Sequence, residues 1–142
     1  MPRRKAIKRS PDELIEPDAS LKELSNAVQS CKGCDIWRRA TQAVFGEGAS
    51  GAEVMLIGEQ PGNREDLKRH PFVVPAGKLL DRALAQAGLE RKRVYIINTV
   101  EHLNSTQRGK FRIHKKPDAE EIAACRPWLE AEIAAVSSGD LR

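Results

Sequence analysis

Three cysteines have a spacing that suggests binding of a metal ion or an iron–sulfur cluster. Cys31 and Cys34 are separated by two residues, and Cys125 lies far downstream. A C-x-x-C pair lets two thiolates reach one metal ion or iron–sulfur cluster. A cubane cluster normally has four cysteine ligands, so these three leave one ligand unaccounted for. Two other interpretations stay open, namely a thioredoxin-like redox pair and a Cys125 that is only a small buried hydrophobe.

A carboxylate and an amide follow two apolar runs. The segment 58–62, Gly-Glu-Gln-Pro-Gly, comes directly after Val-Met-Leu-Ile at 54–57, and Asn98 ends the run 94–97. Continuous β-rich apolar runs of this length predict buried strands. Open α/β sheets bind ligands at the carboxyl ends of their strands, so Glu59 is a candidate site residue.

The elements that would position these residues alternate between strand and helix. We predict a helix after Ser20 as N-cap, strands at 54–57 and 94–97, and a helix over 76–88 closed by Gly88. A long polar loop follows over 99–116. A last helix begins at 117, with an apolar face made by Ile122, Ala123, Leu129 and Ile133. This order predicts the α/β class, a three-layer αβα arrangement around a parallel sheet.

The 142 residues suffice for one modest domain. Residues 1–18 are charged and contain three prolines, which predicts a basic, disordered arm. Residues 19–142 then form the domain. Two parallel strands make a poor independent core, so we interpret 19–142 as the N-terminal part of a larger domain.

The net charge of +4 is concentrated in two clusters. Five cations lie within the first nine residues, and a second group comprises Arg108, Lys110, Arg112, Lys115 and Lys116. Such clusters neutralise phosphates when they flank a cleft, although a solvated tail or loop is the alternative for each. No apolar run is long enough to span a membrane, which favours a cytoplasmic protein, expected to be a monomer.

Seven motifs in order resemble the iron–sulfur (family 4) uracil-DNA glycosylases. They are Cys31-x-x-Cys34, residues 41–46, residues 58–62, Pro71-Phe72-Val73, residues 75–81, Val94-Tyr95-x-x-Asn98 and residues 124–129. Gln60 and the loop Arg112-Ile113-His114-Lys115-Lys116-Pro117 are most similar to the uracil-crosslinking (UdgX-type) branch of that family.

The resemblance implies a DNA repair enzyme that flips uracil out of DNA and cleaves its bond to the sugar. It implies that His114 becomes covalently joined to the sugar and that Glu59 stabilises positive charge there. It implies that Phe72 stacks on the base and that Asn98 reads its edge. The further substrate-binding residues that it implies are Gln60, Asn63, Asp66 and Arg112. It also implies a 4Fe-4S cluster on Cys31, Cys34 and Cys125, with a fourth cysteine absent from this chain, and single-stranded DNA as an acceptable substrate.

Several residues depart from the family pattern. Asn63 stands where an acidic residue is usual, Val74 where Gly is usual, and Glu101 where Lys is usual, while Phe111 replaces a basic residue. The family's later His-Pro-Ser loop does not occur in this sequence. His70 and His102 receive no assigned role. Two alternative functions therefore stay open: an inactive nucleic-acid-binding fragment and a small cysteine-ligated zinc module.

Overall fold

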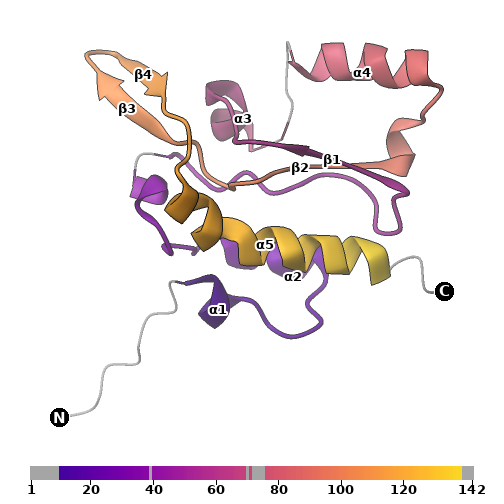
Figure 1. The fold of residues 1–142 in the computed structure, drawn as a ribbon, viewed down its shortest axis with the longest axis horizontal. Helices are drawn as coiled ribbons and strands as arrows, with labels where there is room; N and C mark the ends of the chain where they lie inside the picture. The colour runs from indigo at the N-terminus through magenta and orange to yellow at the C-terminus, as the bar shows by residue number, and fades with distance from the viewer. Residues whose placement is uncertain (1–9, 39, 70, 72–75, 139–142) are drawn as a thin grey trace.

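A computed structural model describes residues 10–38, 40–69, 71 and 76–138 of the chain (Figure 1). The helices are α1 (Pro11–Leu14), α2 (Leu21–Val28), α3 (Asn63–Lys68), α4 (Ala76–Ala87) and α5 (Ala119–Ser138), with 3-10 turns at Asp35–Arg38 and Arg91–Arg93. The strands are β1 (Val54–Gly58), β2 (Val94–Asn98), β3 (Ser105–Arg108) and β4 (Phe111–His114). In this part of the chain no helix is long and apolar enough to cross a membrane.

The central sheet is parallel, as predicted. β1 pairs with β2 in a register that sets Val54 opposite Val94 and Gly58 opposite Asn98. Figure 1 shows α3 and α4 on one side of this sheet and α2 and α5 on the other, which gives the three layers of an α/β fold. β2 is buried along its whole length because both of its faces are covered, one by Leu84 of α4 and the other by Val136 of α5. Glu47 bridges its free edge at Ile96.

β1 differs from the prediction in one respect. We predicted a buried strand, yet its side chains are only partly covered and Ile57 is 51% exposed. Among the described residues β1 is paired on one edge only, and its outer face is incompletely covered. The apolar run therefore correctly predicts a strand but not its burial.

Three predicted helices are present. Ser20 caps α2, since its side chain accepts a hydrogen bond from the Glu23 amide. α4 ends before Gly88, whose φ of +72° is the left-handed conformation expected at a helix C-terminus.

The third helix, α5, buries only part of the predicted face. Ile122 and Leu129 are partly buried and pack against the core, whereas Ala123 and Ile133 are exposed. The most deeply buried residues of the helix include a carboxylate, which a search for apolar residues does not predict; they are Cys125, Trp128, Glu132 and Val136.

Two further predictions are corrected by the structure. Residues 1–9 lie outside the described residues, but 10–18 are not a disordered arm: Pro11–Leu14 form α1, and Leu14 and Ile15 pack against the core. The loop predicted over 99–116 contains the antiparallel hairpin β3–β4, with Ser105 opposite His114. The hairpin extends beyond the sheet at one end of the molecule (Figure 1), and its apolar side chains, Phe111 and Ile113, are exposed rather than packed in the core.

Candidate functional site

Gln60 joins the turn after β1 to both ends of the hairpin. Its side-chain Nε2 donates to the Lys115 carbonyl at 3.1 Å, and its Oε1 accepts from the Asn104 amide at 2.9 Å. Asn104 precedes β3 and Lys115 follows β4, and the Lys115 amide donates to the Asn104 carbonyl at 2.9 Å. One side chain therefore fixes the base of the hairpin against the 58–62 turn.

Arg112 provides a second connection between the hairpin and the region that follows β1. Its Nη1 donates to Asp66 Oδ2 at 2.6 Å, and its Nη2 donates to Asn63. Asp66 is 0% exposed, and its carboxylate also accepts from the amides of Thr41 and Gln42 at 3.0 to 3.3 Å. The structure thus gives Asp66 and Arg112 a positioning contact, and their direct contact with a substrate stays a prediction.

Glu59 and Asn98 lie at the carboxyl edge of the parallel sheet. Asn98 pairs in register with Gly58, the residue before Glu59. The chain after β2 stays beside this turn, since the Thr99 amide donates to the Gly58 carbonyl at 2.7 Å and the Val100 amide to the Glu59 carbonyl at 3.1 Å. Glu59 is exposed and Asn98 is buried. Phe72 lies outside the described residues.

His114 is the last residue of β4, and its side chain is exposed. The next residue, Lys115, is the one whose carbonyl accepts the hydrogen bond from Gln60. The hairpin therefore presents His114 next to its anchor on the 58–62 turn. The structure brings together the segments that carry Glu59, Gln60, Asn98 and His114, which lie up to fifty-five residues apart in the chain.

The three cysteines line one small cavity together with Glu101 and His102. None of them is in a disulfide. The Trp128 indole N–H donates to Cys31 Sγ at 3.2 Å, and the Glu101 amide donates to Cys125 Sγ at 3.3 Å. N–H donors to sulfur are the contacts that stabilise thiolate ligands and tune clusters.

The donor set fits a thiolate-bound metal, but the described side chains do not form a ready-made metal site: no three His, Cys, Asp or Glu of that part of the chain converge on one point. Burial raises the pKa of the Cys125 thiol, and the Glu101 carboxyl raises it further. Metal binding would therefore have to displace a proton from Cys125. The cavity contains about 10 Å³ of free space, enough for one water molecule, so the ligands must move apart to admit a cluster.

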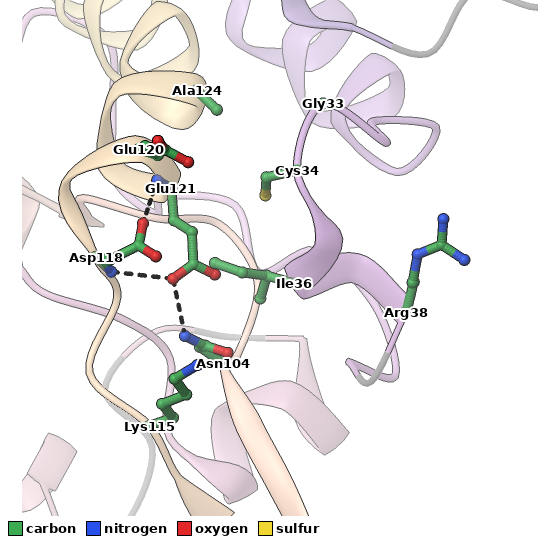
Figure 2. A pocket seen from close by; sticks show the side chains of 10 residues that line it. All are labelled: Gly33, Cys34, Ile36, Arg38, Asn104, Lys115, Asp118, Glu120, Glu121 and Ala124. Atoms are coloured by element: carbon green, nitrogen blue, oxygen red, sulfur yellow. Dashed lines mark hydrogen bonds between the residues drawn. The ribbon is translucent and has the colours of Figure 1, made fainter.

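A second, larger cavity adjoins the cysteine cavity. It has a volume of about 710 Å³ and shares Gly33, Cys34 and Ala124 with the smaller one. Figure 2 shows Cys34 opposite the first turn of α5, where Glu121 accepts hydrogen bonds from the Asp118 amide at 3.0 Å and from Asn104 at 3.3 Å. Neither Glu59, Asn98 nor His114 lines this cavity. It lies between the cysteines and the base of the hairpin, since Asn104 and Lys115 also line it.

Sequence reasoning missed the buried polar groups behind the cysteines. The Tyr95 hydroxyl donates to Glu132 Oε2 at 2.8 Å, and burial raises the pKa of Glu132 to about 7. Burial also raises the pKa of Glu101 well above its ordinary value, and the neighbouring Glu132 carboxyl raises it further. Neither Glu101 oxygen has a hydrogen-bond donor among the described residues, and this lack of donors also disfavours the charged carboxylate.

His102 was given no role from the sequence, and the structure places it in the cysteine cavity. It is 8% exposed, and burial lowers its pKa to about 4 despite an opposing effect of Asp66. The imidazole is therefore neutral at neutral pH, with a lone pair available. In the sequence, His102 lies between the apolar residues Val100 and Leu103, both of which are buried. These apolar neighbours are the signal that could have indicated a buried histidine.

Comparisons with known proteins agree with this arrangement. The family model described as "Uracil DNA glycosylase superfamily" matches residues 45–140. Proteins named "Type-4 uracil-DNA glycosylase" are 42% identical over 115 residues in Sulfurisphaera tokodaii, 38% over 117 in Archaeoglobus fulgidus and 35% over 114 in Thermotoga maritima. These alignments cover 80%, 82% and 80% of this chain and 49%, 55% and 56% of the relatives. The chain thus spans about half the length of the relatives it matches.

Proposed function

Because this chain belongs to the uracil-DNA glycosylase superfamily, we propose that it removes uracil from DNA and that His114 then becomes bonded to the sugar. The contact that best supports the second part is the clamp of Gln60 on Asn104 and Lys115, which holds the His114-bearing hairpin against the 58–62 turn. The relatives' printed name, "Type-4 uracil-DNA glycosylase", supports the first part.

The proposed reaction needs a base pocket, charge stabilisation and a nucleophile. Asn98 offers both a donor and an acceptor to the uracil edge. As the bond between C1′ and uracil N1 breaks, its electron pair leaves with uracil and positive charge develops on the sugar, where the Glu59 carboxylate stabilises it. An imidazole nitrogen of neutral His114 then donates its lone pair to C1′ and forms the new C–N bond.

We assign the proposed 4Fe-4S cluster a structural role rather than a role in the reaction. Cys31, Cys34 and Cys125 would hold a 4Fe-4S cluster, and a bound cluster would supply a cross-link between the segment after α2 and α5. The ligands must be reduced thiols, which favours a cytoplasmic location.

The test is a denaturing gel of the chain mixed with a labelled single-stranded oligonucleotide that contains one uracil. We expect a protein–DNA band that survives denaturation, is absent with a thymine oligonucleotide, and is lost in His114→Ala. Released uracil, measured separately, reports bond cleavage independently of the adduct.

Each result has a distinct meaning. A band that persists in His114→Ala would show that another residue is the nucleophile. Uracil release without a band would support the proposed glycosylase activity and contradict the proposed covalent adduct. If the protein binds the oligonucleotide but forms neither free uracil nor the adduct, the alternative of an inactive nucleic-acid-binding protein is supported. If the protein binds zinc at the cysteines and does not bind DNA, the alternative of a zinc module is supported.

A further inference from the structure

We propose that Phe111 forms a stacking surface for an unpaired base of single-stranded DNA, on the face of the β3–β4 hairpin opposite to the face that carries His114. The proposal rests on the proposed function in that DNA is the ligand, but its test does not require uracil removal. It starts from the side chain of Phe111, which is 76% exposed. The other aromatic side chains that the structure describes are buried or half-buried.

The pairing register divides the hairpin into two faces. Directly opposite residues share a face, and successive residues along each strand alternate between the faces. One face carries Ser105, Gln107, Arg112 and His114, and the other carries Thr106, Arg108, Phe111 and Ile113. The first face is turned toward the body of the protein, since Ser105 is buried and Arg112 donates to Asp66. Phe111 is therefore turned away from the body.

The apolar side chains of this outer face are not covered by the described part of the chain. Ile113 is 42% exposed, in addition to Phe111. The cation–π contacts within the described residues are both made with Trp37, so neither face of the Phe111 ring is occupied by a cation. A ring this exposed contributes little to the core. It is therefore free to contact a ligand.

The charge of the same segment selects nucleic acid as that ligand. Residues 102–117 contain five cations and no acidic residue. Arg108 lies directly opposite Phe111, Lys110 precedes it, and both of these cationic side chains are exposed. Proteins bind single strands through cations that neutralise phosphates combined with aromatic side chains on which bases stack. The outer face of the hairpin and its tip offer both groups side by side.

A second copy of the chain, or another protein, is the competing occupant of this face. A specific protein interface buries about 800 Å² on each partner. The apolar residues of the hairpin are Phe111 and Ile113, both on a strand of 4 residues, and two side chains cannot supply that area. One base needs only one ring. The size of the exposed apolar surface therefore also favours a base.

The distance of Phe111 from His114 predicts which base it contacts. Phe111 is the first residue of β4 and His114 the last. The three residue steps between them span about 10 Å, which is about three nucleotides at the spacing of a stacked strand. The two side chains lie on opposite faces, so the DNA strand crosses an edge of the hairpin between them. The stacked base is therefore about three or more nucleotides from the uracil.

The test compares binding of the full chain to a single-stranded thymine oligonucleotide and to an abasic oligonucleotide of the same length, by fluorescence anisotropy. Phe111→Ala should weaken thymine binding about 5- to 100-fold, the range for loss of one base–aromatic stack. It should change abasic binding by less than about twofold and leave the salt dependence unaltered, since no charge is removed. Phe111→Trp should retain thymine binding, whereas Phe111→Leu, which lacks a ring, should lose most of it.

Photocross-linking locates the stacked base. A single 5-iodouracil is placed at successive positions on either side of one uracil, and the cross-linked peptide is identified by mass spectrometry. We expect a cross-link to Phe111 at about three or more nucleotides from the uracil, and its loss in Phe111→Ala.

Leu79 provides the matched control. It is 69% exposed on α4, among charges of both signs, and Leu79→Ala should leave both affinities unchanged. The proposal is overturned if the wild type does not bind the thymine oligonucleotide, if Phe111→Ala binds it as tightly as the wild type, or if the variant loses equal affinity for the abasic one. A change in oligomeric state without a change in DNA affinity would identify a second copy as the occupant and overturn it too.

Two further outcomes separate this proposal from its neighbours. A loss of affinity confined to duplex DNA would make Phe111 a wedge between paired bases and would overturn the single-strand proposal. Affinity that depends on Phe111 in a protein that releases no uracil would uphold the stacking surface and contradict the proposed glycosylase. The failure of one proposal is therefore distinguishable from the failure of the other.

Discussion

Gln60 shows how one residue can connect a strand end to a distant hairpin. Its amide group is used in both senses, donating to Lys115 and accepting from Asn104. An alanine at this position would keep the turn after β1 but leave both hairpin contacts unmade. The glutamine side chain therefore helps to position the hairpin that carries His114.

The first prediction concerns this clamp. Gln60→Ala removes two hydrogen bonds of about 1 kcal/mol each, so the rate of adduct formation should fall about 10- to 30-fold. Gln60→Glu keeps the acceptor for Asn104 but loses the donor to Lys115. Its rate of adduct formation should therefore lie between those of the wild type and Gln60→Ala. The measurement is the rate of band formation at saturating protein. Equal rates for all three proteins would show that the clamp does not limit the reaction.

The buried Glu132 predicts a pH-dependent stability. Its pKa rises from 4.5 to about 7 on folding, so between these values the folded state binds more protons than the unfolded chain. The free energy of unfolding should therefore fall as the pH rises through this window, by roughly 3 kcal/mol at most. Glu132→Gln should make the profile shallower, and Glu101, whose pKa burial also raises, accounts for the slope that remains. Urea unfolding at several pH values between 4.5 and 8 measures it.

The control for this prediction lies on the same helix. Glu130 is exposed, and Glu130→Gln should leave the slope of stability against pH unchanged. An unchanged slope in Glu132→Gln would mean that the pH dependence arises from another group.

At the scale of elements, the ion pair between Arg112 and Asp66 attaches the hairpin to the segment after β1. The Asp66 carboxylate is wholly buried, so Arg112→Ala leaves a buried charge whose remaining donors, within the part of the chain that the structure describes, are the amides of Thr41 and Gln42. We expect a loss of about 2–3 kcal/mol in the free energy of unfolding, below the usual cost because those donors remain. Urea denaturation tests this. Arg108→Ala, an exposed arginine on the same hairpin, should change stability by less than about 0.5 kcal/mol.

The elements also show what the sequence can predict. Both strands of the parallel sheet and the helices α2 and α4 follow from apolar runs, a serine cap and a glycine terminator, which are local signals. The hairpin was not predicted because β3 is a polar run, Ser-Thr-Gln-Arg, and because β4, in which Phe111 and Ile113 alternate with polar residues, is only 4 residues long.

The features of the candidate site that could not be predicted are contacts between residues far apart in the chain. Gln60 was identified from a resemblance, but its two partners lie 44 and 55 residues away, and no local pattern predicts them. His102 and Glu132 were missed for the same reason, because their neighbours come from other elements.

For the whole molecule, the distribution of charge would decide how the proposed DNA substrate is approached. The predicted basic cluster of residues 108–116 is not uniform, since Arg112 is paired with Asp66 while the other four cations are exposed. Arg108 and Lys110 lie near the hairpin tip, and Lys115 and Lys116 follow β4, so each of them is accessible to phosphates. The hairpin extends past the sheet (Figure 1), so it can follow a DNA backbone next to the His114 position.

This placement predicts the salt dependence of DNA binding. If Arg108 and Lys110 each neutralise one phosphate of a single strand, the double variant Arg108→Ala, Lys110→Ala should reduce the slope of log K against log salt by about 1.4, or 0.7 per contact. Fluorescence anisotropy with a thymine oligonucleotide between 50 and 300 mM salt, roughly the range over which such slopes are resolved, measures binding without catalysis. The matched control, Lys22→Ala with Lys92→Ala, removes the same charge from exposed positions on other elements and should change the slope by much less. Equal effects of the two double variants would mean that net charge, rather than the hairpin, attracts the DNA.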